Sequence, residues 1–464
     1  MASQKLSEAQ SGGPLTRLGL SFAGWSTRWF PDPLVFAFIA VVLIFLIAVA
    51  SGERAAQVAI EGGKSFWSLS NFTMQMAMVV IGGYVVATSA PIKAVIERLS
   101  AVPKRARSAI AFIAFFSMAT SLLSWGLSMI FSALLIRAIA RRMPDLDYRA
   151  AGSAGYLGLG VTWALGLSSS AAMLMATPTA LPAALADISG VIPLTDTLFT
   201  WQNGVMAAVL LATSVAVAYA SAPGAGLSTT ASDLGISLEE GGGAMPKAAT
   251  PGERLEHTPI LTLLVVALLL FYLASVFANS PVGPLAALDL NTYNLIFLTL
   301  GLLLHWRPAS FLKAVTQSVP ATAGVLIQFP FYAVVFGMIV NTGLSHKISE
   351  LFISVSTREV YPLLVAAYSS TLGVFIPSGG SKWLIEAPYV LDAARATGNS
   401  LGWTVQIYNA AEALPNLINP FWMLPMLAIL RCRARDLVGY GMLQMIILIP
   451  VAYGLCWALA MTFH

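Results

Sequence analysis

Long apolar runs recur along this chain of 464 residues, and short polar or basic segments separate them. An α-helix needs about 20 mainly apolar residues to cross the hydrocarbon core of a bilayer. Charged residues make up only 10% of the chain, whereas soluble domains carry roughly 25%. The sequence therefore predicts an all-α polytopic membrane protein. The clearest single runs cover residues 33–50, 72–90, 201–220 and 260–278.

Basic residues gather in the flanks and turns, as in the cytoplasmic loops of membrane proteins. Arg17 and Arg28 lie in or beside a polar leader, residues 1–27, before the first run. This placement predicts a cytoplasmic N-terminus. The net charge of +4 follows from such loops, so we expect the lipid bilayer, and no nucleic acid, as a partner.

The apolar run from Ser108 to Ile139 is too long for one crossing, because 32 helical residues extend about 48 Å. It is interrupted at 121–126 and has basic residues at both ends. A segment with both ends on one side of the membrane is a hairpin. The sequence leaves open whether this hairpin is re-entrant or consists of two short spans.

A hydrophilic linker, residues 222–257, divides the chain into two transmembrane halves, 28–221 and 258–464. The linker carries five acidic and two basic residues, so its charge predicts an external position. Counting spans then places Arg307 and Lys313 outside as well, against the usual charge rule. Charge alone leaves the topology of the second half open.

The second half contains an apolar segment interrupted by Pro377-Ser378-Gly379-Gly380-Ser381-Lys382. Proline and glycine do not continue a helix cheaply, and broken backbone within a membrane occurs where protein or a water-filled cavity covers it. Lys382 and Glu386 follow, although a charge there costs about 2.5–3.5 kcal/mol on insertion scales. We interpret this stretch as half of a substrate site.

A similar stretch lies in the first half, since Ser168–Pro178 and Ser378–Pro388 share the same length at an offset of 210 residues. Interrupted segments in corresponding positions indicate a transporter site, commonly within two inverted repeats with re-entrant or broken helices. Two helix N-termini could then bind one anion; ordinary helix caps with close packing are the alternative. The candidate residues are Ser168, Ser169, Ser170, Ser378, Gly379, Gly380 and Ser381.

Lys382 has two readings of equal weight. It could bind a substrate carboxylate directly, or pair with Glu386 four residues later on the same helix face. In the second case a substrate would compete for Lys382 and leave Glu386 to accept a proton. Glu386 by itself is more typical of a structural partner.

A polar stripe crosses the apolar segment 402–419 at helical spacing. It predicts either interhelical hydrogen bonds or one wall of a permeation cavity, with Glu412 as a site for H⁺ or Na⁺. Gln328, next to Pro330, is expected either to line the site or to stabilise a kink. The stripe consists of Gln406, Asn409, Glu412, Asn416 and Asn419, of which Asn409, Glu412 and Asn416 join Glu386 as coupling candidates.

Enzyme chemistry finds no support in the sequence. No phosphate-binding G-x-x-x-x-G-K-[ST] loop is present, which argues against ATP drive within this chain. The four His and two Cys are scattered without ligand spacing. We therefore expect no enzyme activity, no cofactor and no metal.

Several motifs, taken in order and spacing, resemble the short-chain fatty acid transporter family, the type that imports butyrate and acetoacetate in bacteria. The resemblance covers nearly the whole chain. Its motifs are 28–34 (RWFPDPL), 74–77 (MQMA), 140–144 (ARRMP), 176–178 (ATP), 196–199 (DTLF), 252–256 (GERLE), 301–305 (GLLLH), 328–333 (QFPFYA), 377–380 (PSGG) and 420–422 (PFW).

The resemblance implies a secondary carboxylate transporter of the inner membrane, without cofactor, related to ion transporters built from two inverted repeats. Such transporters often form homodimers and move substrate by an elevator motion. One departure concerns the substrate: members often have a third Gly and then His or Gln before the Trp, where this chain has Ser381 and Lys382. A different organic anion, or a passive anion channel, is the alternative reading.

Overall fold

The computed structural model describes residues 33–224, 228–239, 249–280, 287–375, 378–419 and 422–463. These residues form helices and connecting turns, without a β-strand among them. Within them, six helices are long and apolar enough to cross a membrane. The predicted all-α polytopic fold is confirmed.

The first half begins with four helices, followed by a hairpin and an interrupted helix. The bounds are α3 (Pro33–Ala50), α4 (Ala55–Ser65), α5 (Ser70–Thr88), α6 (Ala90–Ser100), α7 (Ala106–Ser121), α8 (Trp125–Arg142), α9 (Tyr148–Leu157), η1 (Gly158–Thr162), η2 (Trp163–Leu165), α10 (Ser170–Ala176), α11 (Ala183–Ser189), η3 (Leu194–Asp196) and α12 (Trp201–Ser221).

The second half repeats the same kinds of element. The linker ends with the short helix α13 (Pro251–His257). The helices of the second half are α14 (Ile260–Ala278), α15 (Leu290–His305), α16 (Pro308–Ser318), η5 (Val319–Thr322), α17 (Ala323–Val340), α18 (Leu344–Val355), α19 (Tyr361–Phe375), α20 (Gly379–Thr397), α21 (Leu401–Ala413), η6 (Leu414–Leu417), α22 (Leu424–Leu430) and α23 (Ala434–Ala460).

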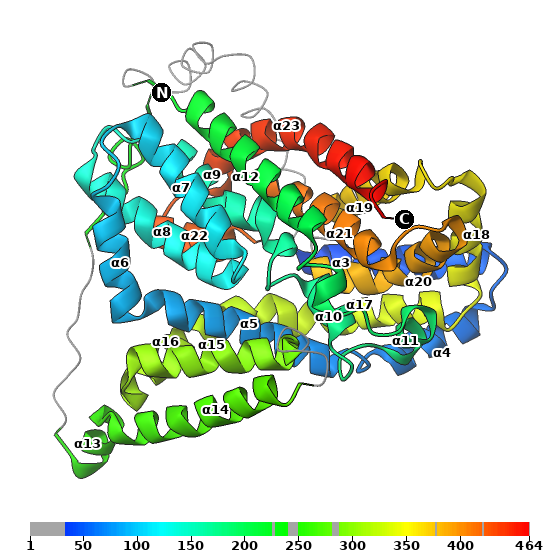
Figure 1. The fold of residues 1–464 in the computed structure, drawn as a ribbon, viewed down its shortest axis with the longest axis horizontal. Coiled ribbons are helices and arrows are strands. Elements are labelled where there is room, and N and C mark those ends of the chain that lie inside the picture. The colour runs from blue at the N-terminus through cyan, green and yellow to red at the C-terminus, as the bar shows by residue number, and fades with distance from the viewer. Residues whose placement is uncertain are drawn as a thin grey trace.

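One order of elements occurs twice: a long helix, a short helix, a hairpin, an interrupted helix and a final long helix. It runs from α5 to α12 and again from α17 to α23. The first hairpin is α7 and α8, and the second is α19 and α20. In Figure 1 these hairpins extend from opposite ends of the molecule toward its centre.

The recurring order corrects the register of the internal match. The stretch beginning at Ser168 lies between the two parts of an interrupted helix, whereas the stretch beginning at Ser378 starts the second arm of a hairpin. By element order, the counterpart of Ser378 is Ser124, which caps α8 by accepting a hydrogen bond from Leu127 N. The equal spacing in sequence therefore paired two different kinds of helix interruption.

The linker packs against the end of the molecule that carries Arg141 and Arg142, here called the basic end. Thr229 N donates to Asp147 Oδ2 at 2.8 Å, and Arg137 donates to Ser237 O at 3.1 Å. The expectation that charge places the linker opposite the basic loops is wrong, because Asp147 and Arg137 bind its backbone at this end. With the linker at the basic end, counting spans places Arg307 and Lys313 at that end as well, which agrees with the charge rule.

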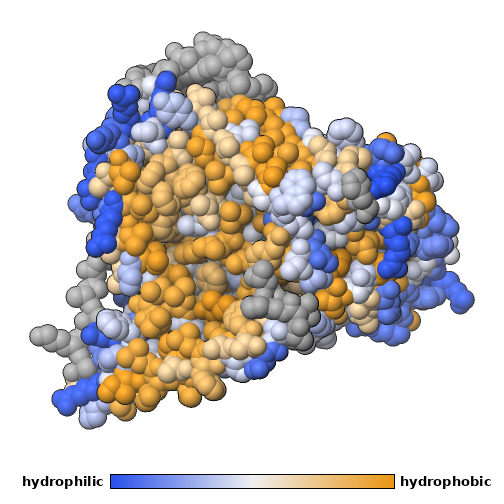
Figure 2. Space-filling view, in the orientation of Figure 1, coloured by the Kyte–Doolittle hydropathy of each residue, from blue (hydrophilic) through white to orange (hydrophobic). Residues whose placement is uncertain are grey.

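The apolar exterior forms a broad band between two polar ends (Figure 2). Helix α14 contributes strongly, with Leu268 70% and Phe271 78% exposed. Side chains of this kind are stable on an exterior only against lipid or another apolar surface. The band therefore supports residence in a membrane.

Candidate substrate and ion site

A cavity lies where the hairpin tips meet the interrupted helices. Residues of both halves line it, and most of the lining is apolar or aromatic. Its polar side comes mainly from the start of α20. The lining residues are Met76, Trp125, Leu159, Trp163, Ser170, Val325, Phe329, Ser378, Gly379, Gly380, Asn416 and Trp422.

The start of α20 approaches its neighbours too closely for side chains at two positions. A Cβ on Gly379 would lie 2.4 Å from the Trp163 ring, and one on Gly380 would lie 2.6 Å from the Phe72 ring. Glycine is thus required by packing between the two halves. The first turn of any helix has backbone N–H groups without intrahelical partners, so the cavity borders a region suited to an anion.

The three serines of the first break have three different positions. Ser168 Oγ accepts from Trp125 N at 3.0 Å and joins the first hairpin tip to the break. Ser169 caps α10 by accepting from Ala172 N at 3.2 Å. Ser170 lines the cavity, and its Cβ lies 3.0 Å from the position of a Cβ on Gly380. The structure thus brings Ser170, but neither Ser168 nor Ser169, to the cavity together with Ser378.

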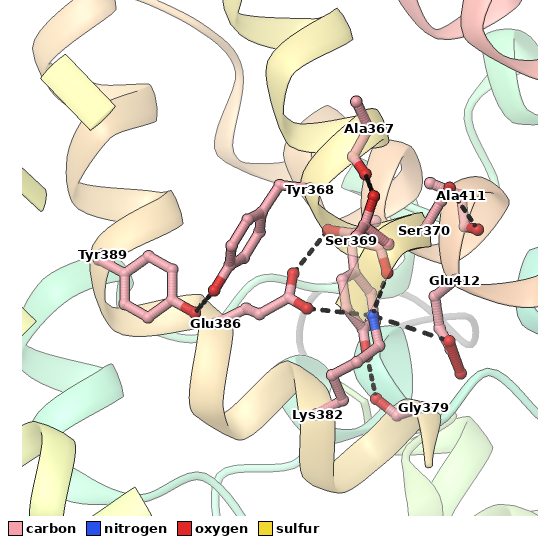
Figure 3. Close-up of polar contacts among 12 residues, drawn as sticks. Ala367, Tyr368, Ser369, Ser370, Gly379, Lys382, Glu386, Tyr389, Ala411 and Glu412 are labelled. Carbon is pink, nitrogen blue, oxygen red and sulfur yellow. Dashed lines mark hydrogen bonds and ion pairs between the residues drawn. The ribbon is translucent and has the colours of Figure 1, made fainter. Parts of the chain in front are cut away.

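Lys382 does not line the cavity, and its ammonium lies in a buried ion cluster (Figure 3). Its Nζ donates to Glu386 Oε1 at 3.0 Å and to Ser369 O at 2.9 Å, and lies 3.7 Å from Glu412 Oε2. Ser369 Oγ donates to Glu386 Oε2 at 2.5 Å. All three charged side chains are at most 1% exposed. Of the two readings of Lys382, the structure contains the pairing with Glu386.

Glu412 is the least satisfied member of this cluster. In the described part of the chain, neither of its carboxylate oxygens accepts a hydrogen bond. Its Oε1 lies 3.2 Å from the position of a Cβ on Gly379. This carboxylate therefore lies between the ammonium of Lys382 and the first turn of α20.

The rest of the polar stripe divides between the two predicted roles. Asn416 lines the cavity. Asn409 donates to Gln406 Oε1 at 2.6 Å, and Gln406 donates to Asn203 Oδ1 of α12 at 2.5 Å. Asn409 thus belongs to a chain of interhelical hydrogen bonds and not to the cavity wall.

Gln328 lines a second cavity beside the first. Trp125 and Trp422 belong to both linings, so the two spaces meet at these rings. The second lining also includes Leu34 and Pro320, near the starts of α3 and α17. Gln328 therefore lies on the approach to the first cavity, and not beside Ser378.

Sequence reasoning missed the aromatic residues of this site. Trp163 lines the cavity, and its buried Nε1 has no hydrogen-bond partner among the described residues. Tyr408 donates to Gly379 O at 2.5 Å. In an apolar segment these residues resemble lipid-facing or core aromatics. The available signal was position: Trp163 precedes a break, and Tyr408 lies one turn before Glu412.

A shielded cavity between two hairpins and two interrupted helices, inside an apolar band, is the arrangement of a membrane transporter. Solved structures share the overall fold. The crystal structure of the Alcanivorax borkumensis YdaH transporter has a TM-score of 0.61 at 14% identity, covering 92% of this chain and 98% of that chain. Neisseria gonorrhoeae MtrF, described with a class of antimetabolite efflux pumps, has a TM-score of 0.56 at 13% identity, covering 96% and 98%.

Sequence comparisons specify the family. The family described as Short chain fatty acid transporter matches residues 14–460. A protein of Escherichia coli strain K12, named as a short-chain fatty acid transporter, is 34% identical over 417 residues, covering 89% of this chain and 93% of its own. One of Haemophilus influenzae with the same name is 30% identical over 443 residues, covering 94% and 98%. The chain belongs to the short-chain fatty acid transporter family.

Proposed function

We propose that this protein is a secondary transporter that moves short-chain monocarboxylates of the butyrate and acetoacetate type together with a proton. The observation that carries the proposal is the composition of the cavity. Its polar side is the first turn of α20, with Ser378, Gly379 and Gly380, and Ser170 faces it. The carboxylate binds at this turn, where free N–H groups and the helix dipole favour an anion.

The acyl chain of the substrate lies against the apolar part of the lining. Met76, Trp163 and Phe329 supply this surface. Burying each CH₂ group is worth about 0.8 kcal/mol. A cavity closed by such large side chains selects short acids.

The coupling ion is assigned from charge balance. Lys382 offers one positive charge to two carboxylates, Glu386 and Glu412, in a cluster that is almost completely buried. Like charges at short range in a poorly polarisable interior repel strongly. A substrate anion at Gly379 would therefore bind together with a proton on Glu412, which removes that repulsion.

A proton suits this position better than Na⁺. The ammonium of Lys382 already lies 3.7 Å from Glu412 Oε2, and a second cation there would be repelled. A proton occupies one carboxylate oxygen and needs no coordination shell. Asn409, remote from the cavity, has a structural role in this proposal, whereas Asn416 contributes to the cavity wall.

The proposed architecture consists of two inverted repeats, within 28–221 and 258–464, joined by the linker 222–257. Two observations support it: the repeated element order and the opposite directions of the hairpins (Figure 1). By the positive-inside rule, the excess of Lys and Arg at the basic end supports a cytoplasmic position for that end. The proposal includes a cytoplasmic N-terminus and residence in the inner membrane. The exposed apolar face of α14 offers a surface for a homodimer within the bilayer.

Uptake of radiolabelled butyrate into proteoliposomes tests the proposal, with imposed proton and sodium gradients and a panel of competing acids. We expect concentrative uptake driven by an inward proton gradient, and competition by other short monocarboxylates. Equilibration without accumulation would indicate a passive channel. Absence of uptake of every monocarboxylate under either gradient would overturn the proposal.

Glu412→Gln separates binding from coupling, because the amide mimics the protonated acid. The variant should bind butyrate and exchange it across the membrane, but lose accumulation driven by the proton gradient. Glu359→Gln is a matched control, since Glu359 is exposed and lies before α19. Proton-driven accumulation by Glu412→Gln at the wild-type level would exclude Glu412 as the proton site.

A further inference from the structure

Tyr408 touches both the anion-binding turn and the ion cluster. It belongs to α21 and is fully buried. Its hydroxyl donates to Gly379 O at 2.5 Å. Its ring faces Lys382, with Nζ 4.3 Å from the ring centroid. The same ring packs on Trp383, with the centroids 4.7 Å apart.

The hydrogen bond from the Tyr408 hydroxyl to Gly379 O anchors the first turn of α20, which has few side-chain contacts of its own. Gly379 and Gly380 have no side chains to anchor them, and glycine has wide backbone freedom. The Ser378 hydroxyl makes no capping bond to α20. The position of this turn against Trp163 therefore depends on a contact made from outside the hairpin, and Tyr408 makes one.

The ring has a separate effect on the ion cluster. An ammonium is attracted to the face of an aromatic ring. Glu386 on α20 and Glu412 on α21 are the acidic groups that face the Lys382 ammonium. The ring thus helps to hold the ammonium between the two carboxylates, 3.0 Å from Glu386 Oε1 and 3.7 Å from Glu412 Oε2.

We propose that Tyr408 is a positioning residue with two separable roles: its hydroxyl sets the position of the anion-binding turn, and its ring holds Lys382 for ion coupling. The inference rests on the proposed function, which supplies the anion and the proton. It predicts that substrate affinity and coupling can be damaged independently at one position.

Two substitutions test the two roles by butyrate uptake in proteoliposomes. Tyr408→Phe keeps the ring and removes the hydroxyl, so KM should rise by about fivefold, the usual value of one buried hydrogen bond, with the proton-to-butyrate ratio unchanged. Tyr408→Leu removes both, so KM should rise and the ratio should fall. If the leucine variant is not recovered folded, Tyr408→Met gives the same measurement with a longer side chain.

Tyr361→Phe is the matched control. Tyr361 is also fully buried, lies at the start of α19 and donates to a backbone carbonyl, Val390 O, at 2.7 Å. It should lower the melting temperature as Tyr408→Phe does, without raising KM.

The outcomes separate the two proposals. Butyrate uptake by the wild type with the same KM in Tyr408→Phe as in Tyr361→Phe would overturn the role of the hydroxyl. A wild-type proton-to-butyrate ratio in the ring-free variants would overturn the role of the ring. No carboxylate uptake by the wild type would instead overturn the proposed function itself.

Discussion

The two hairpins are joined to their neighbouring interrupted helices by different chemistry. Around the first hairpin, hydroxyl and backbone groups make the contacts: Ser121 Oγ lies 2.7 Å from Thr162 Oγ1, and Ser117 Oγ donates to Gly155 O at 2.6 Å. Around the second, Ser370 Oγ likewise donates to a backbone carbonyl, Ala411 O, at 2.9 Å, but a buried ion cluster centred on Lys382 is added. Hydroxyl contacts do not change with protonation, whereas an ionic cluster does.

This difference assigns different tasks to similar elements. The neutral contacts around the first hairpin tip should be insensitive to protonation. The charged cluster can respond to a proton and thereby alter the surroundings of the anion-binding turn. Substitutions of the hydroxyl contacts around the first hairpin should therefore change stability alone, and substitutions in the ion cluster should change coupling.

Lys382→Met should have the largest effect. Removing the cation leaves Glu386 and Glu412 buried without their counter-charge, and breaking a buried ion pair costs about 3–5 kcal/mol. We expect a large fall in melting temperature and no butyrate uptake. Lys382→Met/Glu386→Gln should recover much of the stability, because charge balance returns, but not the uptake. A wild-type melting temperature for Lys382→Met would contradict the prediction that Glu386 and Glu412 need the charge of Lys382.

Gly166→Ala should have the next largest effect, and on stability. Its Cβ would lie 2.2 Å from Leu122 O, and a backbone atom cannot move aside as a side chain can. Overpacking of this kind costs about 1–3 kcal/mol. Gly204→Ala is the control, since a Cβ there meets nothing within 4 Å. Equal melting temperatures for the two variants would show that the first break tolerates displacement.

Ser168→Ala should lower the free energy of unfolding less than Gly166→Ala does. It removes the acceptor of Trp125 N and a donor to Ser121 O at 3.2 Å. Leaving a buried backbone N–H unsatisfied costs about 1–3 kcal/mol. The melting temperature should fall, and the proton-to-butyrate ratio of the folded protein should remain that of the wild type. A changed ratio would place the first break within the coupling machinery.

Hydropathy predicted much of this fold because it is a local property that decides which segments enter a membrane. The run 33–50 is α3, and the interruption near Ser124 is the turn between α7 and α8. The polar stripe begins on α21 and continues into η6, where Asn416 lines the cavity. These features depend on spacing along one segment.

Features that depend on packing between distant segments left no such pattern. The linker is held partly by bonds from Arg137 to backbone carbonyls, which no sequence pattern records. Trp163 and Tyr408 are apolar residues among many, and only the folded arrangement distinguishes a cavity wall from a lipid-facing surface. Similar composition produced the match between Ser168 and Ser378. The order of helices instead pairs Ser378 with Ser124.

The smallest and most direct comparison uses one serine from each region. Ser169 caps α10 through a hydrogen bond, so Ser169→Ala should cost about 1 kcal/mol of stability and leave the KM for butyrate unchanged. Ser378 makes no capping bond and lines the cavity, so Ser378→Ala should leave the melting temperature unchanged and raise KM by about threefold or more. Thermal unfolding in detergent and uptake kinetics measure the two effects. The opposite pattern, with a stability loss at Ser378 and a KM change at Ser169, would mean that the substrate binds at the first break.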